Sequence, residues 1–218
     1  MTERYVALGS SMAAGPGIPP AAKDAPLRAR RSAANYPHLV AQRLRLDLVD
    51  VTYSGATTAH VLTDAQHGTP PQVEVLDGSE ALVTITIGGN DVGYVPMLTR
   101  APRATVLFVD YLTLLPPAGE QAPPLSGADA ALGRRIADTL ERLTGEAAAD
   151  TGCRWVRAAE ASRSHHAWSA DPWTTRFHLL DLFRPGIPKP LHPNAAGMRA
   201  VADLVIAQAG SRRSAHRS

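Results

Sequence analysis

Four short stretches of the chain combine residue types that can carry out acyl transfer. Each stands just beyond an expected strand or just before an expected helix: Gly9-Ser10-Ser11, Ser54-Gly55, Gly88-Gly89-Asn90-Asp91 and His192-Pro193-Asn194. Acyl transfer needs a nucleophile, a base that takes its proton, and donors aimed at the oxyanion that develops. Ser11 offers the hydroxyl and His192 the base. The backbone N–H groups of Ser11 and Gly55 and the side-chain amide of Asn90 offer the donors.

The position of Ser11 favours a role in chemistry. Residues 4–8 form an apolar run that ends at Gly9 and small polar residues, which predicts a buried strand that opens into a tight turn. Ligands of open α/β sheets bind at the carboxyl ends of the strands, so a hydroxyl placed there can meet one. The alternative is that Ser10 or Ser11 only caps the following helix. The three companion stretches favour the nucleophile.

Strands and helices alternate along the chain. Strands are predicted over residues 4–8, 48–53, 81–87, 105–110 and 154–158, and helices over residues 36–46, around 58–62, within 127–150 and over 193–205. In the longest helix, Leu132, Ile136, Leu140 and Leu143 keep a helical stripe. Residues 116–124 and 161–190 are expected to be loops, the second on the active face. This alternation predicts an α/β fold, a three-layer α/β/α arrangement around a doubly wound parallel sheet of five strands.

Composition bounds the function classes. With 218 residues, 44% of them hydrophobic, the chain can form one core, and we expect a single domain over residues 1–210 with a disordered tail over 211–218. The basic stretch at residues 28–31 and the basic tail lack interleaved aromatic residues, which excludes a nucleic-acid platform. No pair of histidines has metal-ligand spacing, so neither a metal nor another cofactor is expected.

The location of the protein is predicted from what the sequence lacks. It contains no apolar window of about 18 residues and no apolar stretch before the first strand. We therefore expect a soluble protein with no membrane insertion. As given, the sequence predicts a cytoplasmic protein, or a secreted one if a signal peptide has been removed. The expected partner is a small-molecule ester, and the oligomeric state is left open.

The four stretches, in this order, resemble the SGNH hydrolases, which are the GDSL-type esterases and lipases. The resemblance extends from Tyr5 to about Ala202 and is closest to the actinobacterial branch, through Ser54-Gly-Ala-Thr-Thr58, Ile87-Gly-Gly-Asn-Asp-Val-Gly93 and His192-Pro-Asn-Ala-Ala-Gly197. It implies a flavodoxin-like fold with Ser11 as nucleophile and His192 as base. It also implies an oxyanion hole formed by Ser11, Gly55 and Asn90.

Two positions depart from the family pattern. Ser10 stands where the family usually has the aspartate of Gly-Asp-Ser, and Lys189 stands where the triad aspartate normally precedes the histidine by three residues. We therefore expect a Ser-His dyad whose imidazole is oriented by a backbone carbonyl, with the carbonyl of Lys189 as the candidate. The rival is a carboxylate from the long loop, with Asp181 the best placed and Asp171 behind it.

The sequence favours a carboxylic ester hydrolase that works through an acyl-enzyme. Short acyl esters are the expected substrates, because no long amphipathic lid marks a lipid interface. A thioesterase or a carbohydrate deacetylase remains an alternative. So does a binding protein that kept the fold but lost catalysis. An α/β-hydrolase is rejected, because Ala13 breaks its Gly-x-Ser-x-Gly pattern. The hypothesis that the first turn binds a nucleotide is weaker still. The glycine spacing fits neither the dinucleotide-binding motif nor the phosphate-loop motif.

Overall fold

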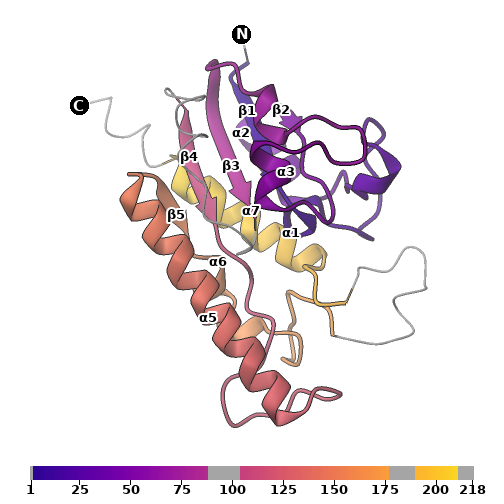
Figure 1. Ribbon diagram of the computed structural model, residues 1–218, viewed down its shortest axis with the longest axis vertical. Coiled ribbons are helices and arrows are strands. Elements are labelled where there is room, and N and C mark those ends of the chain that lie inside the picture. Colours follow the sequence, from indigo (N-terminus) through magenta and orange to yellow (C-terminus); the bar gives the residue numbers. More distant parts are fainter. Residues whose placement is uncertain (1, 88–103, 177–189, 211–218) are drawn as a thin grey trace.

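The computed structural model describes residues 2–87, 104–176 and 190–210. Its centre is a sheet of five parallel strands in the order β2-β1-β3-β4-β5 (Figure 1). The strands are β1 (Arg4–Gly9), β2 (Asp47–Asp50), β3 (Glu80–Thr86), β4 (Thr105–Val109) and β5 (Arg154–Val156). In this flavodoxin-like order the topological switch lies between β1 and β3, where ligands bind at the carboxyl ends of the strands. The predicted fold class is confirmed.

The helices also follow the predicted order. They are α1 (Ser11–Ala14), α2 (Tyr36–Leu44), α3 (Thr58–Leu62), α5 (Gly127–Asp150), α6 (Ala158–Ala161) and α7 (Ala195–Gly210), with 3₁₀ turns at η1 (Leu27–Ala29), η2 (Gln72–Val75) and η3 (Arg163–His165). Three strands are shorter than predicted, since β2 ends at Asp50, β4 at Val109 and β5 at Val156. The chain after β2 still follows β1, because the N–H of Tyr53 donates to the carbonyl of Gly9 over 3.0 Å.

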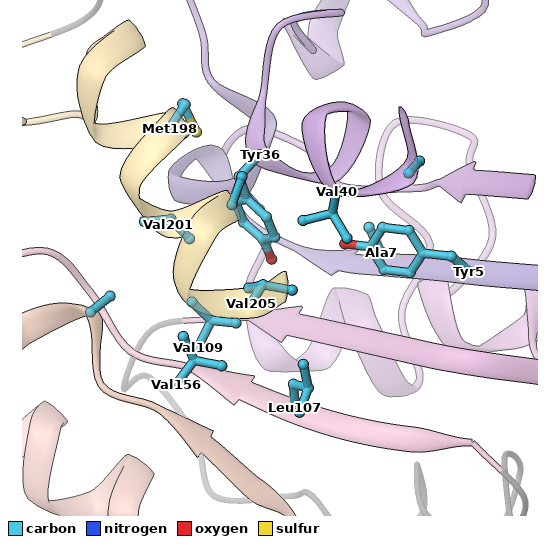
Figure 2. Close-up of a cluster of buried hydrophobic side chains, with 14 of the residues drawn as sticks. Tyr5, Ala7, Tyr36, Val40, Leu107, Val109, Val156, Met198, Val201 and Val205 are labelled. Atoms are coloured by element: carbon cyan, nitrogen blue, oxygen red, sulfur yellow. The ribbon is translucent and has the colours of Figure 1, made fainter. Parts of the chain in front are cut away.

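The core lies on both faces of the sheet. Because side chains alternate along a strand, Tyr5 and Ala7 of β1 face one way and Val6 and Leu8 the other. On the first face they pack with residues of α2 and α7, including Tyr36 and Met198 (Figure 2). On the second face the partners come from α3, η2 and the C-terminal part of α5. The two faces give the three layers.

Helix α5 is much longer than the strands beside it. Its 24 residues span about 36 Å, whereas the five residues of β4 span about 17 Å. The C-terminal part packs on the sheet, where Gly145 lies against the ring of Trp155. The N-terminal part projects beyond the carboxyl ends of the strands (Figure 1).

The apolar side chains of α5 therefore have the predicted helical spacing, but they do not enter the core. Leu132, Ile136 and Leu143 keep 48%, 52% and 37% of their surface exposed.

A buried carboxylate ties the end of β4 to α6. Asp110 accepts hydrogen bonds from the N–H of Ala159 over 2.8 Å and from the indole N–H of Trp155 over 2.9 Å. Its side chain thus satisfies one of the unpaired N–H groups at the start of α6. Burial raises the pKa of Asp110 to about 6, although these hydrogen bonds oppose the shift.

We predict that Asp110 makes stability depend on pH. Because its pKa is raised on folding, its contribution is complete below the ordinary pKa near 4 and is lost as the pH rises through about 6. Asp110→Asn removes the titration. The free energy of unfolding of the variant, relative to that of the wild type, should rise by up to about 3 kcal/mol between pH 4 and 7. Urea unfolding at several pH values measures it.

Asp24→Asn, in an exposed loop, is the control and should show no such trend. A constant difference between Asp110→Asn and the wild type across this range would contradict the prediction.

Candidate active site

The turn after β1 depends on a close approach of two strands. A Cβ on Gly9 would lie 2.3 Å from the carbonyl oxygen of Thr86, and Gly9 has a φ of +143°, so no other residue fits there. The N–H of Ser10 donates to the same carbonyl over 2.9 Å. Helix α1 then begins at Ser11, which places the Ser11 hydroxyl at the carboxyl end of β1. Ser10 precedes the helix, but its side chain makes no capping hydrogen bond.

A buried glutamine holds the same turn from another side. The Oε1 atom of Gln72 accepts from the N–H of Gly9 over 2.7 Å, and its Nε2 group donates to the carbonyl of Gly9 over 3.1 Å. This carboxamide thus satisfies both backbone groups of the residue two positions before Ser11. Gln72 is 6% exposed, so water does not compete strongly for these bonds.

The imidazole of His192 has a partner at each nitrogen. Its Nε2 lies 2.8 Å from the hydroxyl oxygen of Ser11, and its Nδ1 lies 2.8 Å from the carbonyl oxygen of Pro190. A carbonyl can only accept a hydrogen bond, so Nδ1 carries the proton of the neutral ring. Nε2 is then free to accept the hydroxyl proton of Ser11. This is the tautomer that a general base needs.

The segment that carries His192 is anchored to residues 173–175. The N–H of Thr175 donates to the carbonyl of His192, and the N–H of Leu191 donates to the carbonyl of Thr175, both over 2.9 Å. The N–H of Asn194 donates to the carbonyl of Trp173 over 2.9 Å. These bonds fix the backbone on both sides of His192.

The rest of the His-Pro-Asn motif begins α7. The Oδ1 atom of Asn194 accepts from the N–H of Gly197 over 2.9 Å, as an N-cap does, and its Nδ2 group donates to the carbonyl of Pro172. A Cβ on Gly197 would lie 2.2 Å from the carbonyl oxygen of Trp173. Gly197 therefore lets the first turn of α7 approach the anchoring segment closely.

Leu191 has a backbone conformation that a leucine rarely adopts. Its φ is +59°, in the left-handed region, where a side chain meets the following carbonyl. Such strain persists only where surrounding contacts impose it. Here the hydrogen bonds to Thr175 impose it, and the result is that Leu191 and His192 face different parts of the molecule.

The structure describes two of the three expected oxyanion donors, the backbone N–H groups of Ser11 and Gly55. Ser11 is the first residue of α1, where a helix leaves its N–H unpaired, and Gly55 has a φ of +80° in the turn after β2. Within the described residues, neither N–H group has a hydrogen-bond partner. Asn90, the third expected donor, lies outside the described residues.

The two groups expected to orient His192 stay predictions. Lys189 and Asp181 lie outside the described residues, and the carbonyl that the Nδ1 atom of His192 meets is that of Pro190, one residue further along. The two-residue separation lets the imidazole fold back onto its own backbone. The carboxylate of Asp171 lies 3.4 Å from the Nδ1 atom of His165, and no hydrogen bond or ion pair among the described residues joins it to His192.

Sequence reasoning missed the residues that hold the two catalytic candidates in place. Gln72 and Thr175 act through hydrogen bonds to backbone, and the Pro190 contact is made by a carbonyl that every residue type has. The sequence carries no side-chain pattern that would predict such roles.

The described residues contain no group of His, Cys, Asp and Glu that could hold a metal ion. Among the same described residues, no helix is long and apolar enough to cross a membrane.

Comparison with known proteins identifies the family of this chain. Residues 7–200 match the model of the GDSL-like Lipase/Acylhydrolase family. The chain belongs to this family. It is 31% identical over 249 residues to Lipase 2 of Streptomyces coelicolor, and the match covers 91% of the chain and 83% of that protein.

Solved structures agree with this assignment. The phospholipase A1 of Streptomyces albidoflavus superposes with a TM-score of 0.78 at 25% identity, covering 95% of this chain and 99% of the other. The extracellular lipase of Streptomyces rimosus has the same fold, with a TM-score of 0.78 at 24% identity over 95% of this chain and 99% of its own. The protein is thus an esterase-lipase type hydrolase of the GDSL family.

We predict that Gln72 positions the nucleophile of this GDSL hydrolase. Gln72→Leu leaves the N–H of Gly9 unpaired and removes one of the two hydrogen bonds to its carbonyl, which frees the turn to shift. A misplacement of about 1 Å can lower kcat by about 100-fold. KM should change little, because Gln72 does not reach the substrate. Steady-state kinetics on an ester measure both values.

Gln121→Leu, at an exposed loop position, is the matched control and should behave like the wild type. An unchanged kcat in Gln72→Leu, with the variant folded by circular dichroism, would show that the turn keeps its position without the carboxamide.

Proposed function

We propose that the protein is a carboxylic ester hydrolase in which Ser11 and His192 act as a catalytic dyad through an acyl-enzyme. The observation that carries the proposal is the 2.8 Å hydrogen bond between the Ser11 hydroxyl and the Nε2 atom of His192. The tautomer fixed by Pro190 leaves that nitrogen ready to accept a proton. Family membership supports the same reaction class.

The reaction proceeds in two halves. The Ser11 oxygen attacks the ester carbonyl while Nε2 of His192 takes its proton, and the imidazolium then gives that proton to the leaving alcohol. Water repeats the attack on the acyl-enzyme with the same histidine as base. The bond between the Ser11 oxygen and the acyl carbon breaks, the imidazolium returns its proton to the Ser11 oxygen, and the acid is released. No metal or redox partner takes part in these steps.

In the proposed reaction, hydrogen-bond donors other than His192 stabilise the oxyanion. We assign this role to the backbone N–H groups of Ser11 and Gly55, supported by their unpaired state among the described residues. Asn90 is assigned as the third donor from its place in the family motif. One such donor is typically worth about 100- to 1,000-fold in kcat.

The orienting group in this proposal is the carbonyl of Pro190 and not a carboxylate. A carbonyl that accepts from Nδ1–H fixes the tautomer and the ring plane as an aspartate would. It lacks the negative charge that stabilises the imidazolium, so it does less for the charged intermediate. The dyad therefore depends more on accurate placement of His192 by residues 173–175.

The names of the relatives support the class of ester that we propose for this protein. The named relatives are lipases and a phospholipase A1, which act on esters of carboxylic acids. We assign the same bond type to this chain, and short acyl esters as its simplest substrates. Thioester or carbohydrate acetyl hydrolysis remains the alternative within this chemistry. A carbohydrate esterase of Corynascus shares the fold at 16% identity, which carries no substrate information.

We predict that Ser11→Ala abolishes the hydrolysis of p-nitrophenyl acetate and butyrate. Removing a catalytic serine can lower kcat by about 10⁶, so the enzymatic rate should fall by several orders of magnitude. Ser10→Ala, which changes the neighbouring hydroxyl, should keep most of the activity. Mass spectrometry after treatment with a fluorophosphonate should find the label on Ser11.

Label on another residue, or full activity of Ser11→Ala, would contradict the assignment. A wild type that binds esters without hydrolysing them would favour the binding-protein alternative instead.

We predict that Asp181→Asn costs little activity. The Nδ1 proton of His192 already has an acceptor in the Pro190 carbonyl, so no carboxylate is needed to fix the tautomer. If a migrated aspartate completed a triad, its loss would lower kcat by about 10⁴. Asp171→Asn serves as the matched control, because Asp171 lies beside His165. A large fall in kcat for Asp181→Asn alone would replace the dyad with a triad.

A further inference from the structure

The turn that carries Gly55 has one of two possible orientations of its central peptide. The N–H of Ala56 donates to the carbonyl of Tyr53 over 3.0 Å, which closes a β-turn of four residues. At its centre the φ of Ser54 is negative and that of Gly55 is +80°, so the turn is of type II. In a type I turn with the same ends, the central peptide is reversed and the second φ is negative. Glycine adopts both φ ranges at similar cost, so Gly55 by itself does not fix the orientation.

The orientation of this peptide decides where the Gly55 N–H points. The carbonyl of Ser54 and the N–H of Gly55 belong to the same trans peptide and therefore point in opposite directions. The turn lies beside the strand that ends at the nucleophile, because the N–H of Tyr53 donates to the carbonyl of Gly9 over 3.0 Å. A reversed peptide would aim the N–H of Gly55 away from the direction that it has in the type II turn.

A buried carboxamide contacts the carbonyl side of this peptide. The Nε2 group of Gln66 donates to the carbonyl of Ser54 over 3.3 Å. Gln66 is 7% exposed, so water competes little for this bond. A methionine would fill the same space without burying an amide, so packing alone does not explain a glutamine here.

The backbone of Gln66 is fixed by a second tight turn. Gln66 and Thr69 exchange two backbone hydrogen bonds of 2.9 and 3.0 Å, and the Thr69 hydroxyl also donates to the Gln66 carbonyl. His67 and Gly68, between them, have φ values of +51° and +86°, as in a type I′ turn. The ring of His67 stacks on that of Tyr53, with centroids 5.9 Å apart. The two turns therefore pack against each other, and the side chain of Gln66 starts from a rigid position.

We propose that Gln66 is a positioning residue that holds the Ser54–Gly55 peptide in the orientation in which the Gly55 N–H stabilises the oxyanion. The inference rests on the ester hydrolase function proposed above. Gln66 acts only through this peptide. A hydrogen bond to the carbonyl of a peptide also polarises it, which strengthens its N–H as a donor.

Gln66→Met tests the effect on catalysis. The variant keeps the volume of the side chain but leaves the Ser54 carbonyl without its donor, so the reversed peptide gains population. With p-nitrophenyl acetate, kcat should fall by about tenfold, below the 100- to 1,000-fold that complete loss of an oxyanion donor costs. KM should change little, because the oxyanion forms only in the transition state.

Nuclear magnetic resonance of the free protein tests the orientation directly. In a type II turn the Hα of Ser54 lies close to the N–H of Gly55, whereas in a type I turn the N–H of Ser54 does. The wild type should show the first of these nuclear Overhauser contacts. Gln66→Met should weaken it and show the second. A variant that only loosened the packing would not exchange one contact for the other.

Gln66→Glu keeps the shape of the side chain and provides a rescue. A protonated carboxyl can donate to the Ser54 carbonyl, whereas a carboxylate can only accept. Burial raises the pKa of such a carboxyl above its ordinary value near 4.3. The ratio of the kcat of the variant to that of the wild type should therefore rise as the pH falls from about 8 to about 5. The titration of His192 affects both proteins and cancels in the ratio.

Gln42→Met is the matched control, because it makes the same change at an exposed position of α2. It should leave kcat, KM and the contacts of Gly55 as in the wild type. Circular dichroism shows whether each variant folds. If Gln66→Met does not fold, Gln66→Glu still decides, since a ratio that stays constant with pH contradicts the proposal.

Three results would overturn the proposal. The first is a folded Gln66→Met with kcat within about twofold of the wild type. The second is a fall in kcat without reversal of the peptide, and the third is a reversal without a fall in kcat.

Failure of the proposed function has a different signature. If Ser11→Ala hydrolyses acetate at the wild-type rate, the dyad is wrong, whatever the orientation of the peptide in the free protein. If Ser11→Ala is inactive and Gln66→Met matches the wild type in both measurements, the dyad stands and the role of Gln66 alone is refuted.

Discussion

The close approach of Gly9 to Thr86 is the constraint on which the candidate site depends. Only a residue without a Cβ lets β1 end against the backbone of β3 at this point. The chain then turns immediately, and Ser11 begins a helix at the edge of the sheet. Gln72 and Thr86 hold the same turn through hydrogen bonds to Gly9 and Ser10. The position of one hydroxyl is thus set by backbone geometry and not by its own side-chain contacts.

His192 reaches that hydroxyl by an equally indirect route. The chain between Leu191 and Asn194 is paired with residues 173–175, and Asn194 and Gly197 fix where α7 begins. The imidazole is left with its two side-chain torsions, and the carbonyl of Pro190 restricts them by accepting from Nδ1. In the proposed dyad, rigidity takes the place of the charge of an aspartate. Loss of a neighbouring backbone contact should therefore cost it more than loss of any single carboxylate.

The fold and the two central residues could be predicted because both follow from strong patterns. Short apolar strands that alternate with helices require a parallel sheet, and parallel strands bring their carboxyl ends to one edge, where Ser11 and His192 meet. The contact between His192 and the carbonyl of Pro190 could not be predicted, because every residue offers a carbonyl and only the φ and ψ angles select one. The role of Gln72 is hidden for the same reason. The stripe at Leu132, Ile136 and Leu143 has helical spacing, but spacing does not tell which part of a helix the sheet is long enough to cover.

The difference in length between α5 and the strands decides where the uncovered part of this helix lies. A helix that crosses from β4 to β5 runs antiparallel to the strands, so any excess length at its N-terminal part must project past their carboxyl ends. That is the edge at which the topology gathers Ser11, Gly55 and His192. The apolar side chains that the sheet cannot cover are consequently left beside the reacting groups and not at the opposite edge. In this chain the length of one helix thus places an apolar surface at the same end of the sheet as the candidate site, and a shorter α5 on the same sheet would lack that surface.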